Sequence, residues 1–363
     1  MDGCRVQREQ LVKFCTKVFE AVGVADAEAN DAGEILVAAD AAGIESHGVA
    51  RLQRYVNGIR AGIMLPNVAA KVVHSTPLSL VIDAQGAMGL HLSKTTMSEV
   101  IQRAETHGAA FASIRDSNHF GIAGYYAKMA LEKDMIGIAM TNTAALGVPT
   151  FAKDAYFGTN PLAVAVPANQ EAPFVLDMST TVVTRGKIET YLREGRLLPE
   201  QWAVDKRGIP TQDSEKLLAD MLYQLGGGIL PLGGSGELTS GYKGYGLAVM
   251  VDIFTAVLSG GLFGKDVVDA EGTSGRVAHF FGAVRLDLFR EPDAIKNDMG
   301  TMLKALRTAD PAAGETQVYY AGLKEHLHEQ DCAVRGVPLS AKVWSQLQAI
   351  GSELGLPLPE SMS

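Results

Sequence analysis

The sequence predicts an α/β protein with a substantial sheet in its central part and helices at both ends. Short β-rich runs separated by Gly, Asn and Pro begin at about Pro77, and helical patterns lie between several of them. This alternation is typical of α/β folds, although hydrophobic periodicity leaves the strands either parallel or mixed. We expect residues 1–75 to form a helical part that packs with 292–363, around a central α/β part at 76–291.

The helices at the start of the chain are indicated by spacing and by stop signals. Apolar residues recur at helical spacing from Leu11 to Val22, and Gly23 follows them. Asp26 can cap a second helix that runs to about Ala42, where Gly43 ends it. The segment that follows Gly43 therefore lies at a helix junction, where backbone groups are available to a ligand.

The central and C-terminal parts contain further expected elements. Strands are expected at 78–82, 110–114, 136–141, 162–166 and 174–176, with a short one after Ala283. Helices are expected at 122–133, 296–307 and 341–354. The glycine-rich stretch 199–232 is interpreted as a loop that wraps the surface or a cleft. The strongest apolar run, Leu247 to Leu262, contains Asp252 and ends in two glycines, so it predicts a buried helix rather than a membrane span.

Composition limits the classes of function. The chain has 363 residues, 47% hydrophobic and 20% charged, which describes an ordinary globular protein. A formal net charge of -9 provides no general attraction for nucleic acid or an anionic membrane. An anionic ligand must then be captured by individual Arg or Lys side chains.

Cysteine and histidine usage argue against a disulfide scaffold and against a metal centre. The three cysteines show no CxxC spacing, and the eight histidines form no HxxxH pair. The N-terminus lacks a positive-then-apolar signal pattern, so we expect a cytosolic protein. The GxGxxG fingerprint and the P-loop motif are both absent.

The segment Ser46-His47-Gly48-Val49-Ala50-Arg51 is the strongest candidate for chemistry. If its spacing is helical, the imidazole of His47 and the guanidinium of Arg51 project from one face. A proton donor near neutral pH and a planar fork for carboxylates suit a 2-oxo or 2-hydroxy acid. The alternative is a surface Arg and a capped His. A second histidine, His119, in the segment 116–121, favours the chemical interpretation.

Two further motifs suit a nucleotide ligand. Asp177-Met178-Ser179 follows an apolar strand, and an Asp there can accept hydrogen bonds from ribose hydroxyls, although it can equally be a helix N-cap. Lys243-Gly244 opens the long helix, where free amides and a cation can bind an anion. The alternative for Lys243 is a solvated side chain in a flexible loop.

Six motifs, taken in order, resemble the type-2 malate/L-lactate dehydrogenase family. They are Ser46-His47-Gly48-x-x-Arg51, Asn118-His119-Phe120-Gly121, Gly158-Thr159-Asn160-Pro161, Asp177-Met178-Ser179-Thr180, Trp202-Ala203-Val204-Asp205-Lys206 and Lys243-Gly244-Tyr245-Gly246-Leu247. The resemblance implies an NAD(P)-dependent oxidoreductase, usually a homodimer. It also implies that the central part is a nucleotide-binding domain of non-Rossmann type with a large mixed sheet, so the missing GxGxxG is expected.

The resemblance also assigns residues by position. It implies proton transfer by His119 and His47, with His119 favoured because its loop follows a strand end, and substrate binding by Arg51 and Ser46. The cofactor contacts that it implies are Thr143, Asp177, Met178, Ser179, Lys243, Gly244, Ala278, His279 and Phe280. Many relatives carry Pro-Gly-Glu where this chain has Ala321-Gly322-Leu323, which puts a cofactor contact there in doubt.

The expected reaction interconverts a small 2-hydroxy acid and its 2-oxo acid, with a malate-like substrate favoured and NAD as the cofactor. Ureidoglycolate, lactate or sulfolactate oxidation remains an alternative, as do reduction of a cyclic imino acid or a diketo sugar acid and use of NADP. A catalytically silent binding protein on the same scaffold is the alternative from another class.

Overall fold

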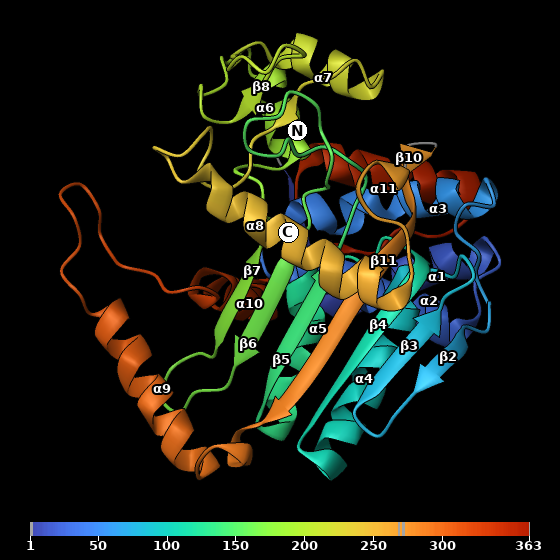
Figure 1. Ribbon diagram of the computed structural model, residues 1–363. Helices are drawn as coiled ribbons and strands as arrows, with labels where there is room; N and C mark the ends of the chain where they lie inside the picture. The colour runs from blue at the N-terminus through green and yellow to red at the C-terminus, as the bar shows by residue number, and fades with distance from the viewer. Residues whose placement is uncertain (1–2, 268, 271–272, 363) are drawn as a thin grey trace.

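The computed structural model describes residues 3–267, 269–270 and 273–362. Its central feature is a sheet with the strand order β2-β3-β4-β11-β5-β6-β7, to which β10 adds by pairing with β11 (Figure 1). The strands are β2 (Lys71–Ser75), β3 (Ser79–Asp83), β4 (Ala109–Asn118), β5 (Met135–Thr141), β6 (Leu162–Val166), β7 (Phe174–Met178), β10 (Asp269–Ala270) and β11 (Thr273–Arg285). Along this order β3 and β4 pair in parallel and the other neighbours are antiparallel. The sheet is therefore mixed.

The middle strand of the sheet is the element that sequence analysis placed worst. Only a short strand after Ala283 was predicted, whereas β11 spans Thr273–Arg285 and pairs with both β4 and β5. Its residues from Val277 to Phe281 are buried, so the strand lacks the alternation of apolar and polar residues that marks a half-exposed strand. Residues 71–75, at the end of the expected N-terminal part, form the exposed edge strand β2.

Helices cover the two faces of the sheet unequally. One face packs against α4 (Gly89–His107) and α5 (Ala123–Met129), and the other carries α8 (Gly241–Asp252) with its π-helical continuation η4 (Ile253–Val257) (Figure 1). The prediction of a buried helix here is wrong, because Ile253 is 44% exposed and Val257 is 53% exposed. The helix is apolar on its outer side as well as on the side that covers the sheet. No helix in the described ranges is long and apolar enough to cross a membrane.

The two ends of the chain meet in a second, three-stranded sheet. In it β1 (Cys4–Val6) lies between β12 (Val337–Leu339) and β13 (Ser361–Met362). Around it lie the helices α1 (Arg8–Ala21), α2 (Asp26–Ala41), α3 (Leu52–Arg60), α10 (Leu323–Arg335) and α11 (Ala341–Leu354). An ion pair of 2.8 Å between Arg5 and Asp331 joins the N- and C-terminal segments. By contrast, α9 (Pro292–Arg307) lies at the β7 side of the large sheet (Figure 1).

The stretch predicted as loop between 199 and 232 belongs to a small lobe with its own core. The lobe contains α6 (Arg185–Arg193), β8 (Ala203–Val204), α7 (Ser214–Leu222) and β9 (Gly228–Ile229), and it lies above the large sheet in Figure 1. Its buried apolar residues are Ile188, Leu198, Ala203, Leu217 and Ile229. A core this small gives little hydrophobic periodicity, which explains why sequence reasoning interpreted the segment as loop.

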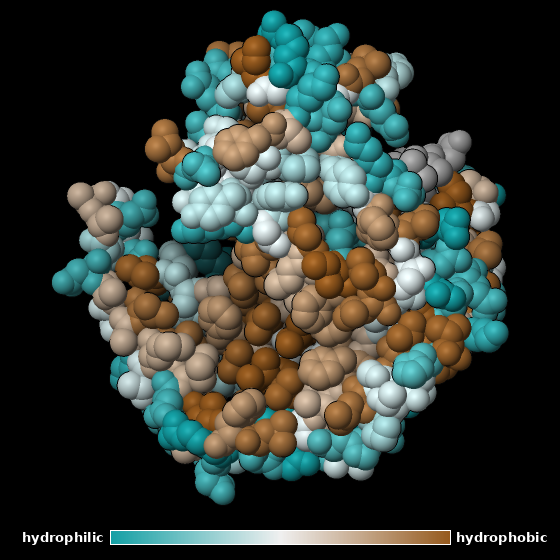
Figure 2. Space-filling view, in the orientation of Figure 1, coloured by the Kyte–Doolittle hydropathy of each residue, from teal (hydrophilic) through white to brown (hydrophobic). Residues whose placement is uncertain are grey.

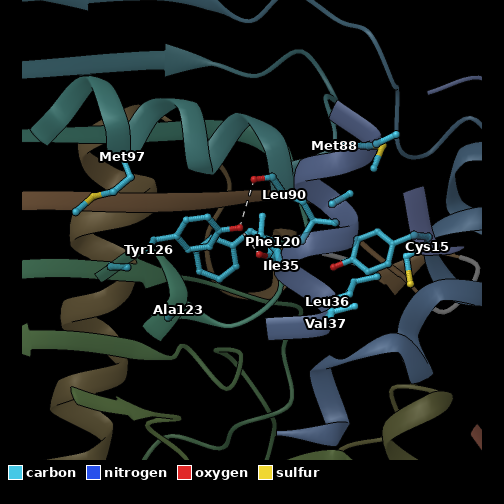
Figure 3. Packing of buried hydrophobic residues seen from close by; sticks show 14 of the residues in the cluster. Cys15, Ile35, Leu36, Val37, Met88, Leu90, Met97, Phe120, Ala123 and Tyr126 are labelled. Carbon is cyan, nitrogen blue, oxygen red and sulfur yellow. Dashed lines mark hydrogen bonds between the residues drawn. The ribbon is translucent and has the colours of Figure 1, made fainter. Parts of the chain in front are cut away.

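The main core fixes the loop after β4 against the N-terminal helices. Phe120 and Tyr126 stack with ring centroids 4.9 Å apart, and they pack beside Ile35 of α2 and Leu90 of α4 (Figure 3). The hydroxyl of Tyr126 donates to the carbonyl oxygens of Leu90 and Phe120. Because Phe120 is held in this way, the position of its neighbour His119 is set by the core.

Candidate active site

Two histidines from distant parts of the chain form the centre of the site. His47 ends the short 3-10 helix η1 (Glu45–His47), and His119 follows β4. Their rings stack with centroids 5.6 Å apart and an interplanar angle of 20°. The two motifs that sequence analysis singled out separately are therefore one site.

The hydrogen bonds of His119 define its tautomer. Its Nδ1 lies 3.2 Å from the backbone N–H of Gly121 and 2.6 Å from the hydroxyl of Tyr55. Because a backbone N–H can only donate, Nδ1 is the acceptor, and the neutral ring carries its hydrogen on Nε2. Burial, with the charges of Arg54 and Arg51, lowers the pKa of His119 well below its ordinary value of 6.5.

His47 is held in a similar electrostatic environment. Its Nδ1 lies 2.9 Å from Oγ of Ser46. Burial comes first among the causes that lower the pKa of His47 to about 4, and the positive charges of Arg51 and Arg54 add to it. Both imidazoles are therefore neutral at pH 7 in the absence of an anionic ligand.

Arg51 reaches the same cavity by a route that differs from the predicted helix. The segment forms two short 3-10 helices, η1 and η2 (Val49–Arg51), with an extended Gly48 between them. The Nε of Arg51 donates to the carbonyl oxygen of Ser46 at 2.6 Å, which leaves the outer guanidinium nitrogens to a ligand. The prediction of one continuous helical face was wrong, but both side chains line one cavity.

A buried carboxyl group on α2 holds this segment in place. Oδ2 of Asp40 accepts from the backbone N–H of Val49 at 2.7 Å, and Asp40 is 3% exposed. A Cβ atom on Gly48 would lie 2.0 Å from Oδ1 of Asp40, so only glycine fits there. Burial raises the pKa of Asp40 to about 7, and the charge of Glu45 acts in the same direction.

The cavity has a volume of about 260 Å³ and is lined by residues from three parts of the fold. Its lining comprises Ser46, His47, Arg51, Arg54, His119, Thr143, Ala144, Leu146, Thr159, Thr184, Arg185, Gly186 and Glu189. A narrower pocket of about 40 Å³ adjoins it, with Phe120, Pro161 and Val277 as an apolar wall. Of the predicted site residues, the structure brings Ser46, His47, Arg51, His119 and Thr143 together here.

Asp177 lines a second and larger cavity. This cavity has a volume of about 570 Å³ and lies between α5, β7 and α10. Oδ2 of Asp177 accepts from the backbone N–H of Gly124 at 2.7 Å, and burial raises the pKa of Asp177 to about 6. Ile44 and Ile122 also line it, and they lie within three residues of His47 and His119. The lining of this cavity thus includes the same two chain segments that carry the histidines.

The remaining predicted cofactor residues lie around these cavities rather than in them. Met178 packs in the cluster beneath α8, and Oγ of Ser179 donates to the carbonyl oxygen of Thr181 at 3.0 Å. Lys243 is exposed at the start of α8, outside the lining of either cavity, and Gly244 packs against the backbone of Leu232.

The segment Ala278-His279-Phe280 lies inside the sheet on β11. His279 is completely buried, and its two ring nitrogens lie 2.8 Å from Oγ1 of Thr141 and 2.9 Å from Oγ of Ser117. Its ring stacks on Phe120 at 4.6 Å. In this position His279 supports the loop that carries His119.

Sequence reasoning missed four side chains that matter to the site. Tyr55 follows Arg51 at a spacing of one helical turn, and that spacing was a usable signal. Arg54 follows Arg51 by three residues and offered a similar signal, whereas Asp40 and Arg185 gave none, because only tertiary contacts bring them to the site.

The chain is similar to known proteins over nearly its whole length. Residues 6–348 match the family model described as malate/L-lactate dehydrogenase. Malate dehydrogenase of Pyrococcus abyssi is 37% identical over 352 residues, which cover 97% of this chain and 95% of the relative. L-sulfolactate dehydrogenase of Methanocaldococcus jannaschii is 32% identical over 97% of this chain and 98% of its own. The crystal structure of Entamoeba histolytica malate dehydrogenase superposes with a TM-score of 0.93 at 29% identity, covering 99% of this chain and all of that one.

The fold and these matches define an oxidoreductase of the hydroxy acid dehydrogenase class. The chain belongs to the malate/L-lactate dehydrogenase family. Membership implies a nicotinamide cofactor and a small-molecule substrate.

Proposed function

We propose that this protein interconverts malate and oxaloacetate in the cavity that holds His47 and His119. The observation that carries the proposal is the stacked pair of neutral imidazoles beside the guanidinium of Arg51. The names of the relatives at 37% identity support malate as the substrate. Arg51 binds the carboxylate next to the reacting carbon through its outer nitrogens, and Ser46 lies beside it.

The proton is moved by the histidine pair. In oxidation, the neutral imidazole of His47 accepts the proton of the substrate hydroxyl, while the Nε2–H of neutral His119 donates a hydrogen bond to the same oxygen, and the lowered pKa values keep both rings neutral. In reduction, the same group must be protonated to donate to the carbonyl oxygen. The negative charge of a bound oxaloacetate favours that protonated form, because it opposes the effect of Arg51 and Arg54.

The residues around the histidines suit a nicotinamide nucleotide. The apolar wall of Phe120, Pro161 and Val277 fits a flat ring, and the hydroxyl groups of Thr143 and Thr159 lie beside it. The bound cofactor supplies or accepts the hydride. The larger cavity with Asp177 is large enough for much of the rest of a dinucleotide.

We infer that NAD is preferred over NADP. Asp177 accepts hydrogen bonds as a ribose hydroxyl requires, and its carboxylate repels the additional phosphate of NADP. Glu325 lines the same cavity and acts in the same direction, whereas the charge of Glu329 is compensated by Lys128 at 2.6 Å. Titration of protein fluorescence with NADH and with NADPH tests this preference, and equal affinities contradict it.

We infer that the working form is a homodimer in the cytosol. Val249, Ile253 and Val257 are exposed on α8 and η4 at a spacing of four residues, and Leu258 adjoins them. Figure 2 has a hydrophobic surface over this region and the sheet below it. Such a stripe is self-complementary across a twofold axis, so a second copy can cover it. Light scattering should give twice the chain mass, and Val257→Lys should give the monomer.

The experiment that tests the activity is a panel of 2-oxo acids assayed with NADH and with NADPH. Oxaloacetate should give the highest kcat/KM, above pyruvate, sulfopyruvate and oxalurate. A cyclic imine and a diketo sugar acid complete the panel, because they represent the reductase alternatives. Nicotinamide binding without turnover of any substrate would instead support a silent binding protein.

A further inference from the structure

The candidate cavity contains more positive charge than one carboxylate requires. Arg51, Arg54 and Arg185 all line it, and Glu189 is the one acidic side chain among the described residues of the lining. The two imidazoles add no charge at pH 7, because their pKa values are lowered. The formal net charge of the whole chain is -9, so this local excess of cations is a property of the site.

The three arginines come from two parts of the fold. Arg51 and Arg54 belong to the N-terminal segment, and both act on the pKa of His47 and of His119. Arg185 comes from α6 of the small lobe, so the cavity receives arginines from two separate parts of the fold.

The local structure of α6 gives no sufficient reason for a cation at this position. Arg185 is the first residue of the helix, where the helix dipole disfavours positive charge. Its Nε donates to Oε1 of Glu189 at 3.0 Å, but both side chains are more than a third exposed, and such pairs contribute little to stability. Arg185 lines a cavity that already holds Arg51, and the one side-chain hydrogen bond that its guanidinium makes to a described residue uses Nε.

We propose that Arg185 binds the second anionic group of the substrate and so selects dianionic 2-oxo and 2-hydroxy acids over monoanionic ones. This inference rests on the proposed function, because it takes Arg51 as the ligand of the first carboxylate. The planar guanidinium forms two parallel hydrogen bonds with a carboxylate or a sulfonate. Arg51 and Arg185 then hold the two ends of the substrate, and the carbon between them is presented to the histidines.

The test compares two substrates that differ in one group. Oxaloacetate carries the second carboxylate, and 2-oxobutanoate has a methyl group in its place. In Arg185→Gln, kcat/KM for oxaloacetate should fall about 100-fold, since the loss of one partner of a desolvated charge pair has effects of this order. The value for 2-oxobutanoate should change less than about threefold, because that substrate never uses the charge.

A matched variant on the same helix controls for damage to α6. Arg193→Gln removes a cation that donates to Thr190 and lies outside the lining of the cavity, so both substrates should keep their wild-type values. Arg185→Lys should recover part of the activity with oxaloacetate, because an ammonium restores the charge without the fork. Circular dichroism confirms that each variant is folded.

Two further measurements separate the competing explanations. If Arg185 binds a cofactor phosphate instead, Arg185→Gln weakens NADH binding in a fluorescence titration, and the proposal is wrong. An equal loss for both substrates also contradicts it. If the wild-type protein prefers sulfopyruvate to oxaloacetate, malate is the wrong substrate, and the same comparison with sulfopyruvate then decides the role of Arg185. A wild-type preference for 2-oxobutanoate overturns both proposals.

Discussion

The hydroxyl of Tyr55 lies 2.6 Å from Nδ1 of His119, and the two rings meet edge to face with centroids 5.9 Å apart. Tyr55 is completely buried on α3, the helix that begins directly after Arg51. Because the backbone N–H of Gly121 also points at Nδ1, the tyrosine hydroxyl donates as well. Tyr55 thus connects α3 to His119, and its hydrogen bond helps to set the tautomer of that histidine.

Tyr55→Phe should lower kcat by about fivefold, because one hydrogen bond to Nδ1 contributes roughly 1 kcal/mol and helps fix Nε2 as the protonated nitrogen. KM should change little, since Tyr55 does not line the substrate cavity. Steady-state kinetics measure both parameters. Tyr191→Phe is the control, because it removes a hydroxyl that accepts from Arg196 in the small lobe and lies outside the lining of both cavities. If Tyr55→Phe has the same kcat as the wild type, Tyr55 has no positioning role.

Arg51→Lys should raise KM for oxaloacetate, because an ammonium cannot reproduce the planar fork. The expected rise is about 10- to 100-fold, the range for losing one bidentate contact. Arg60→Lys is the matched control. Arg60 lies at the end of the helix that follows Arg51 and pairs with Glu353, so this variant should leave KM unaltered. An unchanged kcat/KM in Arg51→Lys would remove this residue from the site.

The pH dependence should differ between the two directions of the reaction. The pKa of His47 is lowered to about 4 and that of His119 also lies well below 6.5, so the neutral form needed for oxidation persists in acid. We expect kcat/KM for malate to stay constant from pH 8 to about pH 5 and to fall below it. For oxaloacetate, kcat/KM should decrease as the pH rises, because fewer molecules carry the proton to be donated. A malate profile that falls already near pH 6.5 would contradict the lowered pKa values.

Asp40 should make the folded protein less stable at alkaline pH. The pKa of Asp40 is raised from its ordinary value of 3.8 to about 7 by folding, so the folded state holds the proton more tightly than the unfolded chain. The resulting stability is fully present below pH 3.8 and is lost as the pH rises through 7. Asp40→Asn keeps an acceptor for Val49 and cannot ionise. Relative to wild type, the unfolding free energy of the variant should therefore increase between about pH 5 and about pH 8.5. Urea titration at both pH values measures the difference. A difference that stays constant would refute this.

Local pattern was sufficient to predict most strands but not the sheet. The run at 162–166 coincides with β6, and the helix expected at 341–354 coincides with α11. The middle strand β11 was missed, because a strand buried on both faces shows no alternation. The small lobe was missed because its core consists of few side chains from separate segments.

The candidate site was predictable only as separate pieces. His47, Arg51 and His119 stood in recognisable motifs, but the stacking of the two imidazoles depends on the packing of Phe120 in the main core. Asp40 and Arg185 come to the site through tertiary contacts that no local spacing encodes. Asp40 and Arg185 could be assigned to the site only from the positions of the helices and of the small lobe in the fold.

The most direct test of the account is the turnover of oxaloacetate by His119→Ala and His47→Ala, followed by the absorbance of NADH. Wild type should turn over, and His119→Ala should lose about 10²- to 10⁴-fold in kcat, the usual contribution of a general acid or base. His47→Ala should also lose activity, and the larger loss identifies the group that transfers the proton. The exposed His74 on β2 provides the control His74→Ala, which should match wild type. Near-normal kcat in both His119→Ala and His47→Ala would contradict the assignment of the stacked histidines as the catalytic pair.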